Sequence, residues 1–314
     1  MSVPAVTVVL PCYNAAGHLG KTLDSVLAQD HPEVRLIAVD DGSTDATVAV
    51  LREYEARCAG RLTWQSGPNQ GANHARNAGL ALAETPYVAF LDADDAYEGP
   101  LLRCAIETAE TEGADLVFST MEIRYPDGSA KQRGPYGPPD YDNRRLVREW
   151  LSGLQLNPSA TLWRTAFVRQ IGGWDEAIRL NQDGEIVLRA LMRGARVGAN
   201  RHGRGIYRLG VPGSLSGAQR QPRKLAALLD TMDSLRAEAE ATGFGDAVEG
   251  IDFVVYRIAR WSFEAGEIAL GRAALSRLKK GAYRRHHGSR WHRLGAALLG
   301  LERKVRLSRY FARG

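Results

Sequence analysis

The chain has 314 residues, of which 44% are hydrophobic and 25% are charged, as is usual for a soluble globular protein of one or two domains. Its three cysteines are scattered without the spacing of a metal site or a disulfide framework, and no apolar run approaches the roughly 20 residues of a membrane span. The N-terminus lacks the basic-then-apolar layout of a signal peptide, so we expect a cytoplasmic protein.

The net charge of +5 conceals a strong asymmetry along the chain. From Gly271 to Gly314 there are thirteen Lys or Arg residues and the single acid Glu302, which leaves residues 1–270 with a net charge of −7. An acidic body with a basic end predicts that the end meets an anionic surface.

The first ninety-five residues alternate between apolar runs and amphipathic stretches. Expected strands span residues 6–10, 34–39, 62–65 and 86–91, and expected helices span 19–29, 47–57 and 72–83. Strands separated by helices predict an α/β fold with a doubly wound, mostly parallel sheet and right-handed crossovers. Open sheets of this kind bind ligands beyond the carboxyl ends of their strands.

Three carboxylates, Asp92, Asp94 and Asp95, follow the fourth expected strand. They repel one another unless a positive charge lies between them, and oxygen ligands of this kind suit Mg²⁺ or Mn²⁺. The alternative is a solvated acidic turn without a ligand.

Polar and aromatic residues also follow the other three expected strands. They are Pro11, Tyr13, Asp40, Asp41, Asn69 and Gly71. A nucleotide diphosphate needs a stacking face and a polar partner for its base, and a cation for its phosphates. The glycine fingerprints G-x-G-x-x-G and G-x-x-x-x-G-K-[ST] are absent from the expected phosphate-binding turns, which favours phosphate binding through a metal.

The chain resembles the bacterial, inverting family-2 glycosyltransferases with the GT-A fold in four successive motifs. These are Pro-x-Tyr-Asn at 11–14, Asp-Asp-Gly-Ser-Thr-Asp at 40–45, Asn-Gln-Gly-Ala-Asn-His-Ala-Arg-Asn-Ala-Gly at 69–79, and Phe-Leu-Asp-Ala-Asp-Asp at 90–95. The resemblance implies the GT-A fold with Mn²⁺ or Mg²⁺ as cofactor. Asp92-x-Asp94 would be the DXD motif, in which Asp94 binds the metal directly and Asp92 faces the ribose or a metal-bound water.

The same resemblance implies a nucleotide site. Tyr13 and Asp41 would flank the base, Arg76 would lie near the nucleotide, and Pro11 and Asn69 would complete the nucleotide-binding set. Ordinary packing is the alternative for Tyr13. Asp45 is interpreted as a helix cap.

The middle of the chain is expected to supply the acceptor side. Expected helices span residues 100–112, 144–152 and 165–170, expected strands span 115–125 and 157–163, and a mobile loop is expected at 131–143. The run from Ile171 to Glu176 is similar to the Gly-Gly-Phe-Asp-Glu element of the family and places Trp174 and Asp175 on the acceptor side. An aromatic ring here can stack on a pyranose, and core packing is the alternative.

Residues 181–185 precede a helix expected at 186–193, where the family has Glu-Asp. The resemblance makes Asp183 the general base for the acceptor hydroxyl, with a plain helix cap as the alternative. A helix N-terminus stabilises a carboxylate and weakens it as a base, so burial has to tune it. Gln182 replaces the family's Glu, which leaves acceptor preference open.

A second departure lies in Tyr207-Arg208-Leu209-Gly210, followed by serines at 214 and 216. Gly210 stands where a histidine that helps to bind the metal is often found, so the metal would have fewer protein ligands. His202 is nearby in sequence and is expected to be a solvent-exposed loop residue.

The motifs stop near residue 220, which predicts a GT-A domain at 1–220 and a helical C-terminal region at 221–314. Residues 224–241 and 251–270 are expected amphipathic helices. The basic end, 284–311, would place Trp291, Leu294, Leu298, Leu301 and Val305 on one face. Such a helix can lie on an anionic membrane or close a homo-oligomer, and nucleic acid is a weaker third partner because the basic run lacks interleaved stacking aromatics.

Together these features predict an inverting hexosyl- or N-acetylhexosaminyltransferase. It would move a sugar from a nucleotide-sugar donor, expected to be UDP-linked, to a hydroxyl of a saccharide or lipid-linked saccharide. The setting would be cell-surface polysaccharide or glycoconjugate synthesis at the inner face of the membrane. A non-catalytic nucleotide-sugar-binding or scaffold protein is the alternative.

Overall fold

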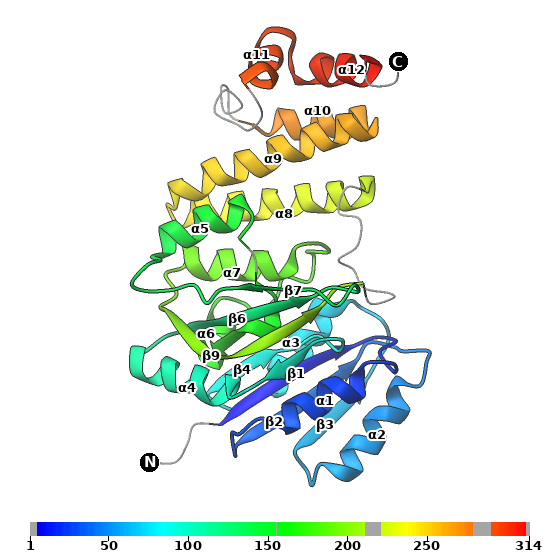
Figure 1. The fold of residues 1–314 in the computed structure, drawn as a ribbon, viewed down its shortest axis with the longest axis vertical. Coiled ribbons are helices and arrows are strands. Elements are labelled where there is room, and N and C mark those ends of the chain that lie inside the picture. The colour runs from blue at the N-terminus through cyan, green and yellow to red at the C-terminus, as the bar shows by residue number, and fades with distance from the viewer. Residues whose placement is uncertain (1–4, 155, 211–220, 279–289, 312–314) are drawn as a thin grey trace. The chain divides into compact units, whose positions relative to one another are not determined.

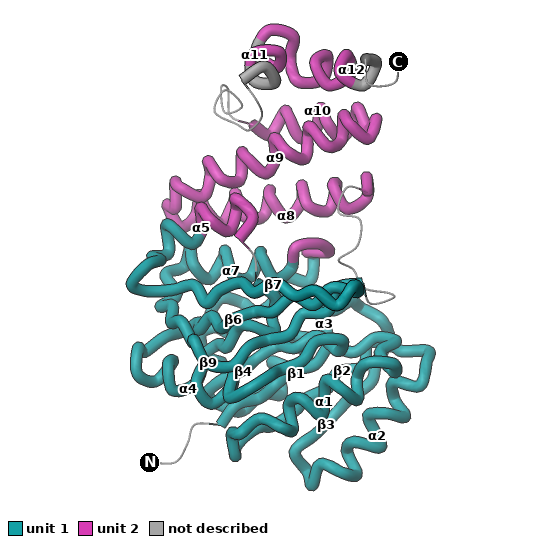
Figure 2. Tube along the Cα trace, viewed as in Figure 1, with its two compact units in different colours: residues 1–146, 155–177, 182–215 teal, residues 147–154, 178–181, 216–314 magenta. Residues whose placement is uncertain are grey.

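A computed structural model of the chain describes residues 5–154, 156–210, 221–278 and 290–311. The chain divides into two compact units (Figure 2). The larger comprises Met1–Leu146, Gln155–Ala177 and Gln182–Leu215, and the smaller comprises Val147–Leu154, Ile178–Asn181 and Ser216–Gly314. The domain boundary predicted at residue 220 falls at the end of the segment 211–220, outside the described residues.

The described part of the larger unit contains one nine-stranded sheet (Figure 1). Its strands are β1 Val6–Cys12, β2 Val34–Asp40, β3 Leu62–Ser66, β4 Tyr87–Phe90, β5 Ala96–Glu98, β6 Leu116–Arg124, β7 Ala130–Arg133, β8 Thr161–Arg164 and β9 Val197–Arg208. They lie in the order β3-β2-β1-β4-β8-β6-β9-β5, with β7 beside β6. The first four are mutually parallel, as predicted, whereas β8 is antiparallel to β4 and β6, so the whole sheet is mixed.

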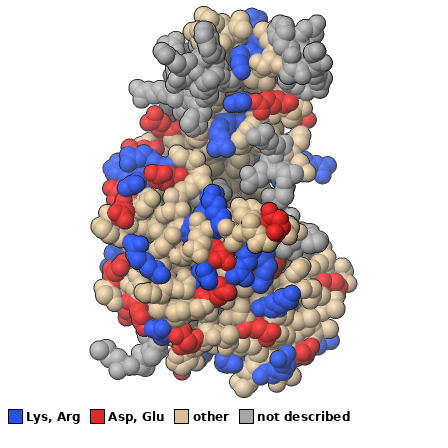
Figure 3. Space-filling model, in the orientation of Figure 1, with Lys and Arg blue, Asp and Glu red and all other residues tan. Residues whose placement is uncertain are grey.

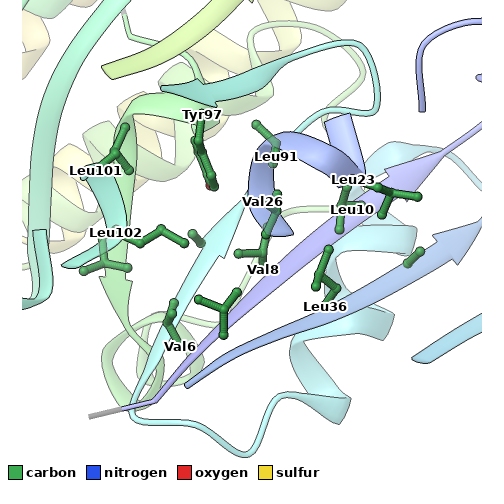
Figure 4. Packing of buried hydrophobic residues seen from close by; sticks show 14 of the residues in the cluster. Val6, Val8, Leu10, Leu23, Val26, Leu36, Leu91, Tyr97, Leu101 and Leu102 are labelled. Atoms are coloured by element: carbon green, nitrogen blue, oxygen red, sulfur yellow. The ribbon is translucent and has the colours of Figure 1, made fainter. Parts of the chain in front are cut away.

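Helices cover both faces of the sheet, which confirms the α/β class. Those of the larger unit are α1 Leu19–Leu27, α2 Thr47–Arg57, α3 Ala72–Leu82, α4 Leu101–Glu112, α6 Thr165–Gln170, α7 Gln182–Met192 and the 3-10 helix η1 Pro158–Ala160; α5 Asn143–Ser152 crosses between the units. On one face, Val8 and Leu10 of β1 pack with Leu23 and Val26 of α1 in the main core (Figure 4). Strand side chains alternate between faces, so neighbouring positions serve opposite layers.

The opposite face of the sheet is covered by α3. Ile37 and Val39 of β2 pack there against Ala75. The close approach of α3 depends on Gly79, because a Cβ at that position would lie 2.4 Å from the Val9 Cγ1 atom. This contact fixes α3, which carries most of the site described below, against β1.

Several predicted bounds are wrong. β7 begins at Ala130 and takes up the first three residues of the loop expected at 131–143, and the strand expected at 157–163 is η1 followed by β8. β5 and β9 were not expected, since β5 has three residues and β9 is rich in glycine and arginine, without an alternating apolar pattern. They are strands because β5 pairs with β9 and β9 pairs with β6 through their backbones.

The described part of the smaller unit is helical, which confirms the predicted C-terminal helical extension. Its helices are α8 Pro222–Ala241, α9 Gly245–Ala265, α10 Ile268–Ser276, α11 Arg290–Leu299 and α12 Leu301–Phe311. The single helix expected at 251–270 is interrupted at Gly266, and the C-terminal one at Gly300; both glycines have positive φ, at 95° and 76°. Among the described residues, no helix combines the length and the apolarity needed to cross a membrane.

Candidate active site

The carboxyl ends of β1, β2, β3 and β4 lie at one edge of the sheet, because these four strands are parallel. The residues predicted for the nucleotide therefore follow neighbouring strands. Tyr13 is 53% exposed, so its ring is available for stacking, and Pro11 lies in β1 opposite Val39. The structure thus brings these predicted residues to a common edge, although they come from four separate motifs.

Asp41 organises the loop that leads into α3. Its two carboxylate oxygens accept hydrogen bonds from the amides of Gln70, at 2.7 Å, and Gly71, at 2.8 Å. Asn69 is exposed beside them, and a Cβ on Gly42, whose φ is +77°, would lie 2.9 Å from the Asn69 amide nitrogen. The Asp41 carboxylate and Gly42 together fix the backbone at the N-terminus of α3.

Asp45 was predicted to cap α2, but the N-cap of this helix is Ala46 and Asp45 lies one residue before it. Its Oδ1 atom accepts a hydrogen bond from the Thr47 amide at 2.9 Å, and its Oδ2 atom accepts one from the Ala16 amide at 3.1 Å. It therefore joins the first two loops at the sheet edge.

Arg76 lies at the centre of the predicted set and is only 4% exposed. Its Nη2 donates to Asp92 Oδ1 at 2.7 Å, and its Nη1 donates to Asn73 Oδ1 and Gln182 Oε1, both at 3.1 Å. Its guanidinium carbon lies 4.4 Å from the centroid of the Trp174 ring. One buried cation therefore links the DXD motif, the aromatic segment and the start of α7.

Two further residues of α3 bind the segment around Trp174, and the sequence analysis missed both. Asn77 accepts a hydrogen bond from the Trp174 amide at 2.9 Å and donates one to its carbonyl at 2.8 Å. Asn73 donates to the Asp175 carbonyl at 2.7 Å. With Arg76 they occupy positions i, i+3 and i+4, one face of the helix, and this polar cluster on a buried face is the signal that could have identified them.

Trp174 is buried, with 3% exposure, and packs edge-on against Phe90 with ring centroids 5.1 Å apart. Because Arg76 covers its face, the structure favours core packing over sugar stacking. Asp175 accepts a hydrogen bond from the Ala177 amide at 2.9 Å and so stabilises the following turn. Its carboxylate does not take part in the Arg76 contacts.

A pair of buried charges holds the same segment from α7. Glu185 and Arg189 form an ion pair of 2.7 Å, and the Arg189 guanidinium also donates to the carbonyls of Ile171 and Gly173. The two residues are spaced i, i+4, which on most helices marks a pair on the exposed face. Because this pair is buried, it stabilises the turn that carries Trp174.

Asp183 lies in the first turn of α7, which starts at Gln182 and not at 186 as expected. Burial raises the pKa of Asp183 to about 7, against the lowering effect of Arg76 and with a further rise from Asp92. Burial thus outweighs the charge of Arg76, and the resulting pKa suits an effective base at neutral pH.

A small pocket of about 10 Å³ adjoins this carboxylate. Its walls include Asp183, Trp174, Asn157, Pro158, Trp163 and Ile186. The indole nitrogen of Trp174 is buried without a hydrogen-bond partner among the described residues. The pocket is therefore mainly apolar with a carboxylate at its wall, and it has room for about one water molecule.

The DXD carboxylates fit a divalent cation. Burial, followed by repulsion from Asp92, raises the pKa of Asp94, and the same causes raise the pKa of Asp95 well above its usual value. Asp95 accepts a hydrogen bond from the Arg208 amide through Oδ1, while its buried Oδ2 has no partner within the described part of the chain. Oxygen ligands crowded in this way are stabilised by a cation such as Mg²⁺ or Mn²⁺.

The described residues contain no group of three His, Cys, Asp or Glu side chains arranged to hold a metal. Mg²⁺ in nucleotide sites is commonly held by one or two carboxylates together with substrate phosphates, a donor set that Asp94 and its neighbours can supply. Gly210 has a φ of +78°, and a Cβ there would lie 2.6 Å from Pro126 Cγ, so the backbone disfavours a histidine. His202 is exposed, as expected, but it lies in the middle of β9 and not in a loop.

The comparisons with known proteins agree with this geometry. The putative teichuronic acid biosynthesis glycosyltransferase TuaG of Bacillus subtilis is 35% identical over 135 residues, which cover 43% of this chain and 54% of that protein. The succinoglycan biosynthesis protein ExoO of Rhizobium meliloti is 28% identical over 259 residues, covering 79% and 71%. The chain spans 37% to 61% of the length of several relatives.

Solved structures share the fold. TarS 1–349 of S. aureus in complex with UDP-GlcNAc has 18% sequence identity and a TM-score of 0.58, covering 87% of this chain and 90% of that one. The mannosyltransferase PcManGT from Pyrobaculum calidifontis, in complex with GDP-Man and Mn²⁺, has 18% identity and a TM-score of 0.58, covering 100% and 81%. These likenesses confirm the predicted GT-A fold. The family model described as Glycosyl transferase family 2 matches residues 7–168, more than half of the sequence, and the chain therefore belongs to family 2 of the glycosyltransferases.

Proposed function

We propose that this glycosyltransferase moves a sugar from a UDP-linked donor to a hydroxyl acceptor with inversion at the anomeric carbon. Two relatives are named for the synthesis of teichuronic acid and succinoglycan, and one structural neighbour binds UDP-GlcNAc. These names support a saccharide or lipid-linked saccharide as acceptor, in cell-surface polysaccharide or glycoconjugate synthesis.

The observation that carries the proposal is the position of Arg76 between two carboxylate groups. On one side it pairs with Asp92 of the DXD motif, and on the other it bonds Gln182, the neighbour of Asp183. The charges of Asp92 and Asp183 both raise the pKa of Arg76, against burial as the largest and opposing effect. A glycosyltransferase needs a carboxylate near the departing diphosphate and another near the incoming hydroxyl, because both groups react at the same anomeric carbon.

Asp183 would accept the proton of the acceptor hydroxyl. The acceptor oxygen would then bond the anomeric carbon on the face opposite the diphosphate, whose bond to that carbon breaks with the electron pair leaving on oxygen. Attack from the opposite face inverts the configuration. Asp94 would hold Mn²⁺ or Mg²⁺, which supplies neutralising charge for the diphosphate when bound. Arg76 would keep Asp92 in place beside that site.

The test uses the purified chain with a panel of UDP- and GDP-sugars and simple saccharide acceptors, with and without Mn²⁺. We expect metal-dependent release of UDP and, by proton NMR, a product of inverted anomeric configuration. A retained configuration would contradict inversion, and preferred turnover of a GDP-sugar would contradict the donor assignment. Binding of UDP without turnover of any donor would support a non-catalytic role instead.

The role of Asp183 is tested by Asp183→Asn, which keeps the shape and removes the base. Transfer should fall by at least about a hundredfold, while UDP affinity should change little. Asp127→Asn, in an exposed turn of the same unit, is the matched control. Transfer by Asp183→Asn at the parent rate would place the base elsewhere.

A further inference from the structure

The last two helices of the smaller unit, α11 and α12, have one buried face and one exposed face. Ala296, Leu301 and Val305 are at most 5% exposed, and α12 packs on α9 and α10. Arg272 of α10 donates two hydrogen bonds to the Glu302 carboxylate, at 2.8 and 2.9 Å. The two helices are therefore anchored on their own unit.

The same two helices also expose leucines. Leu298 is 75% exposed, Leu294 is 50% exposed, and Leu299 and Leu307 are each 46% exposed. Seven large hydrophobic side chains are exposed in the described part of the chain, and these four all lie within its last twenty-one residues. Leu294 and Leu298 are four residues apart and so lie on the same side of α11.

The sequence of these two helices carries a net positive charge. Residues 290–311 contain six Lys or Arg and the single acid Glu302, whose carboxylate is already bound by Arg272. Burial, followed by the charge of Arg260, lowers the pKa of Lys304. In contrast, Lys, Arg, Asp and Glu side chains are interspersed over the visible face of the larger unit (Figure 3).

We propose that the exposed face of α11 and α12 docks on an anionic phospholipid bilayer, with Leu294, Leu298, Leu299 and Leu307 entering the interface. A bilayer surface offers an apolar layer for leucines directly below anionic headgroups for the cations, so it matches both features at once. A nucleic acid would leave the leucines in water. A second copy joined about a two-fold axis would bring the same positive face against itself.

The test is flotation of the full chain with vesicles of phosphatidylcholine alone, or of phosphatidylcholine with a minor fraction of phosphatidylglycerol. We expect binding to the anionic vesicles alone, and a steep loss of binding as salt is raised, because exposed charges are screened over about 10 Å at 0.1 M. Leu298→Glu should reduce the bound fraction at least about tenfold, since it adds repulsion and removes apolar burial.

Leu82→Glu is the matched control, because Leu82 is 51% exposed on α3 and lies outside this face. It should float as the parent does, and circular dichroism and transfer to a soluble acceptor should show that both variants are folded. Equal flotation of the parent and Leu298→Glu would overturn the proposal, as would failure of the parent to bind anionic vesicles at low salt. A dimer that Leu298→Glu dissociates, without lipid binding, would assign the face to a second copy.

Discussion

The pH dependence of transfer is the sharpest consequence of the environment of Asp183. Burial, against the effect of Arg76, raises the pKa of its carboxyl to about 7, so that the carboxyl is largely protonated at pH 6 and largely ionised at pH 8. Since the ionised form is the base in the proposed mechanism, kcat/KM for the acceptor should rise with pH through this range. Activity should therefore fall as the pH falls, because the carboxylate becomes protonated. A mechanism that needs the protonated acid would show the opposite dependence.

The magnitude follows from the fraction ionised. With a pKa of about 7, roughly a tenth of the enzyme has an ionised Asp183 at pH 6 and roughly nine tenths at pH 8, so kcat/KM should increase about tenfold. The assay measures UDP release at saturating donor and Mn²⁺ from pH 5.5 to 8.5, with unfolding followed at each pH. A flat profile, or an acid limb at the ordinary pKa of about 4, would refute this assignment of the base.

Arg76→Gln tests whether the charge of Arg76 influences the pKa of Asp183. It removes the cation that lowers the pKa of Asp183, so the acid limb should move to higher pH. Arg57→Gln, in an exposed ion pair of α2, is the control and should leave the limb unchanged. A limb that stays in place in Arg76→Gln would show that Arg76 serves only to hold Asp92.

Three further substitutions test the metal site and the packing around it. Asp94→Ala should weaken Mn²⁺-dependent UDP binding at least about tenfold by calorimetry, and unchanged affinity would refute Asp94 as a metal ligand. Glu185→Ala leaves Arg189 buried without its carboxylate and should lower the free energy of unfolding by about 3–5 kcal/mol in urea; a loss below 1 kcal/mol would show that the pair is not a support. Gly79→Ala should cost about 1–3 kcal/mol through its contact with Val9, and an unchanged urea midpoint would contradict the tight packing of α3.

The sequence alone was enough for the class of fold and for the edge of the sheet where the site lies. Regular alternation of apolar strands with amphipathic helices predicts β1 to β4, and parallel strands place their following loops at one edge. Tyr13, Asp41 and Asp92 could be grouped on this ground, because each follows its strand within a few residues. These are local signals, set by neighbours in the chain.

The local signals failed where structure depends on distant partners. β9 lacks an apolar pattern and is stabilised as a strand by β5 and β6, which begin about a hundred and about eighty residues earlier in the sequence. A continuous amphipathic helix was expected at 284–311, but Gly300 divides its described part, with Leu298 exposed and Leu301 buried. The side chain of Trp291 and residues 284–289 lie outside what the structure describes.

The sequence determined which residue types this protein has for the candidate site, whereas the tertiary structure decided how they act on one another. Nothing local predicts that Arg76 pairs with Asp92, stacks on Trp174 and bonds Gln182, since these partners come from three other segments. The pKa of Asp183 is likewise a property of burial and of charges brought near by folding. A helix N-terminus by itself would have kept that carboxylate ionised, and the desolvation that reverses this exists only once the chain has closed around it.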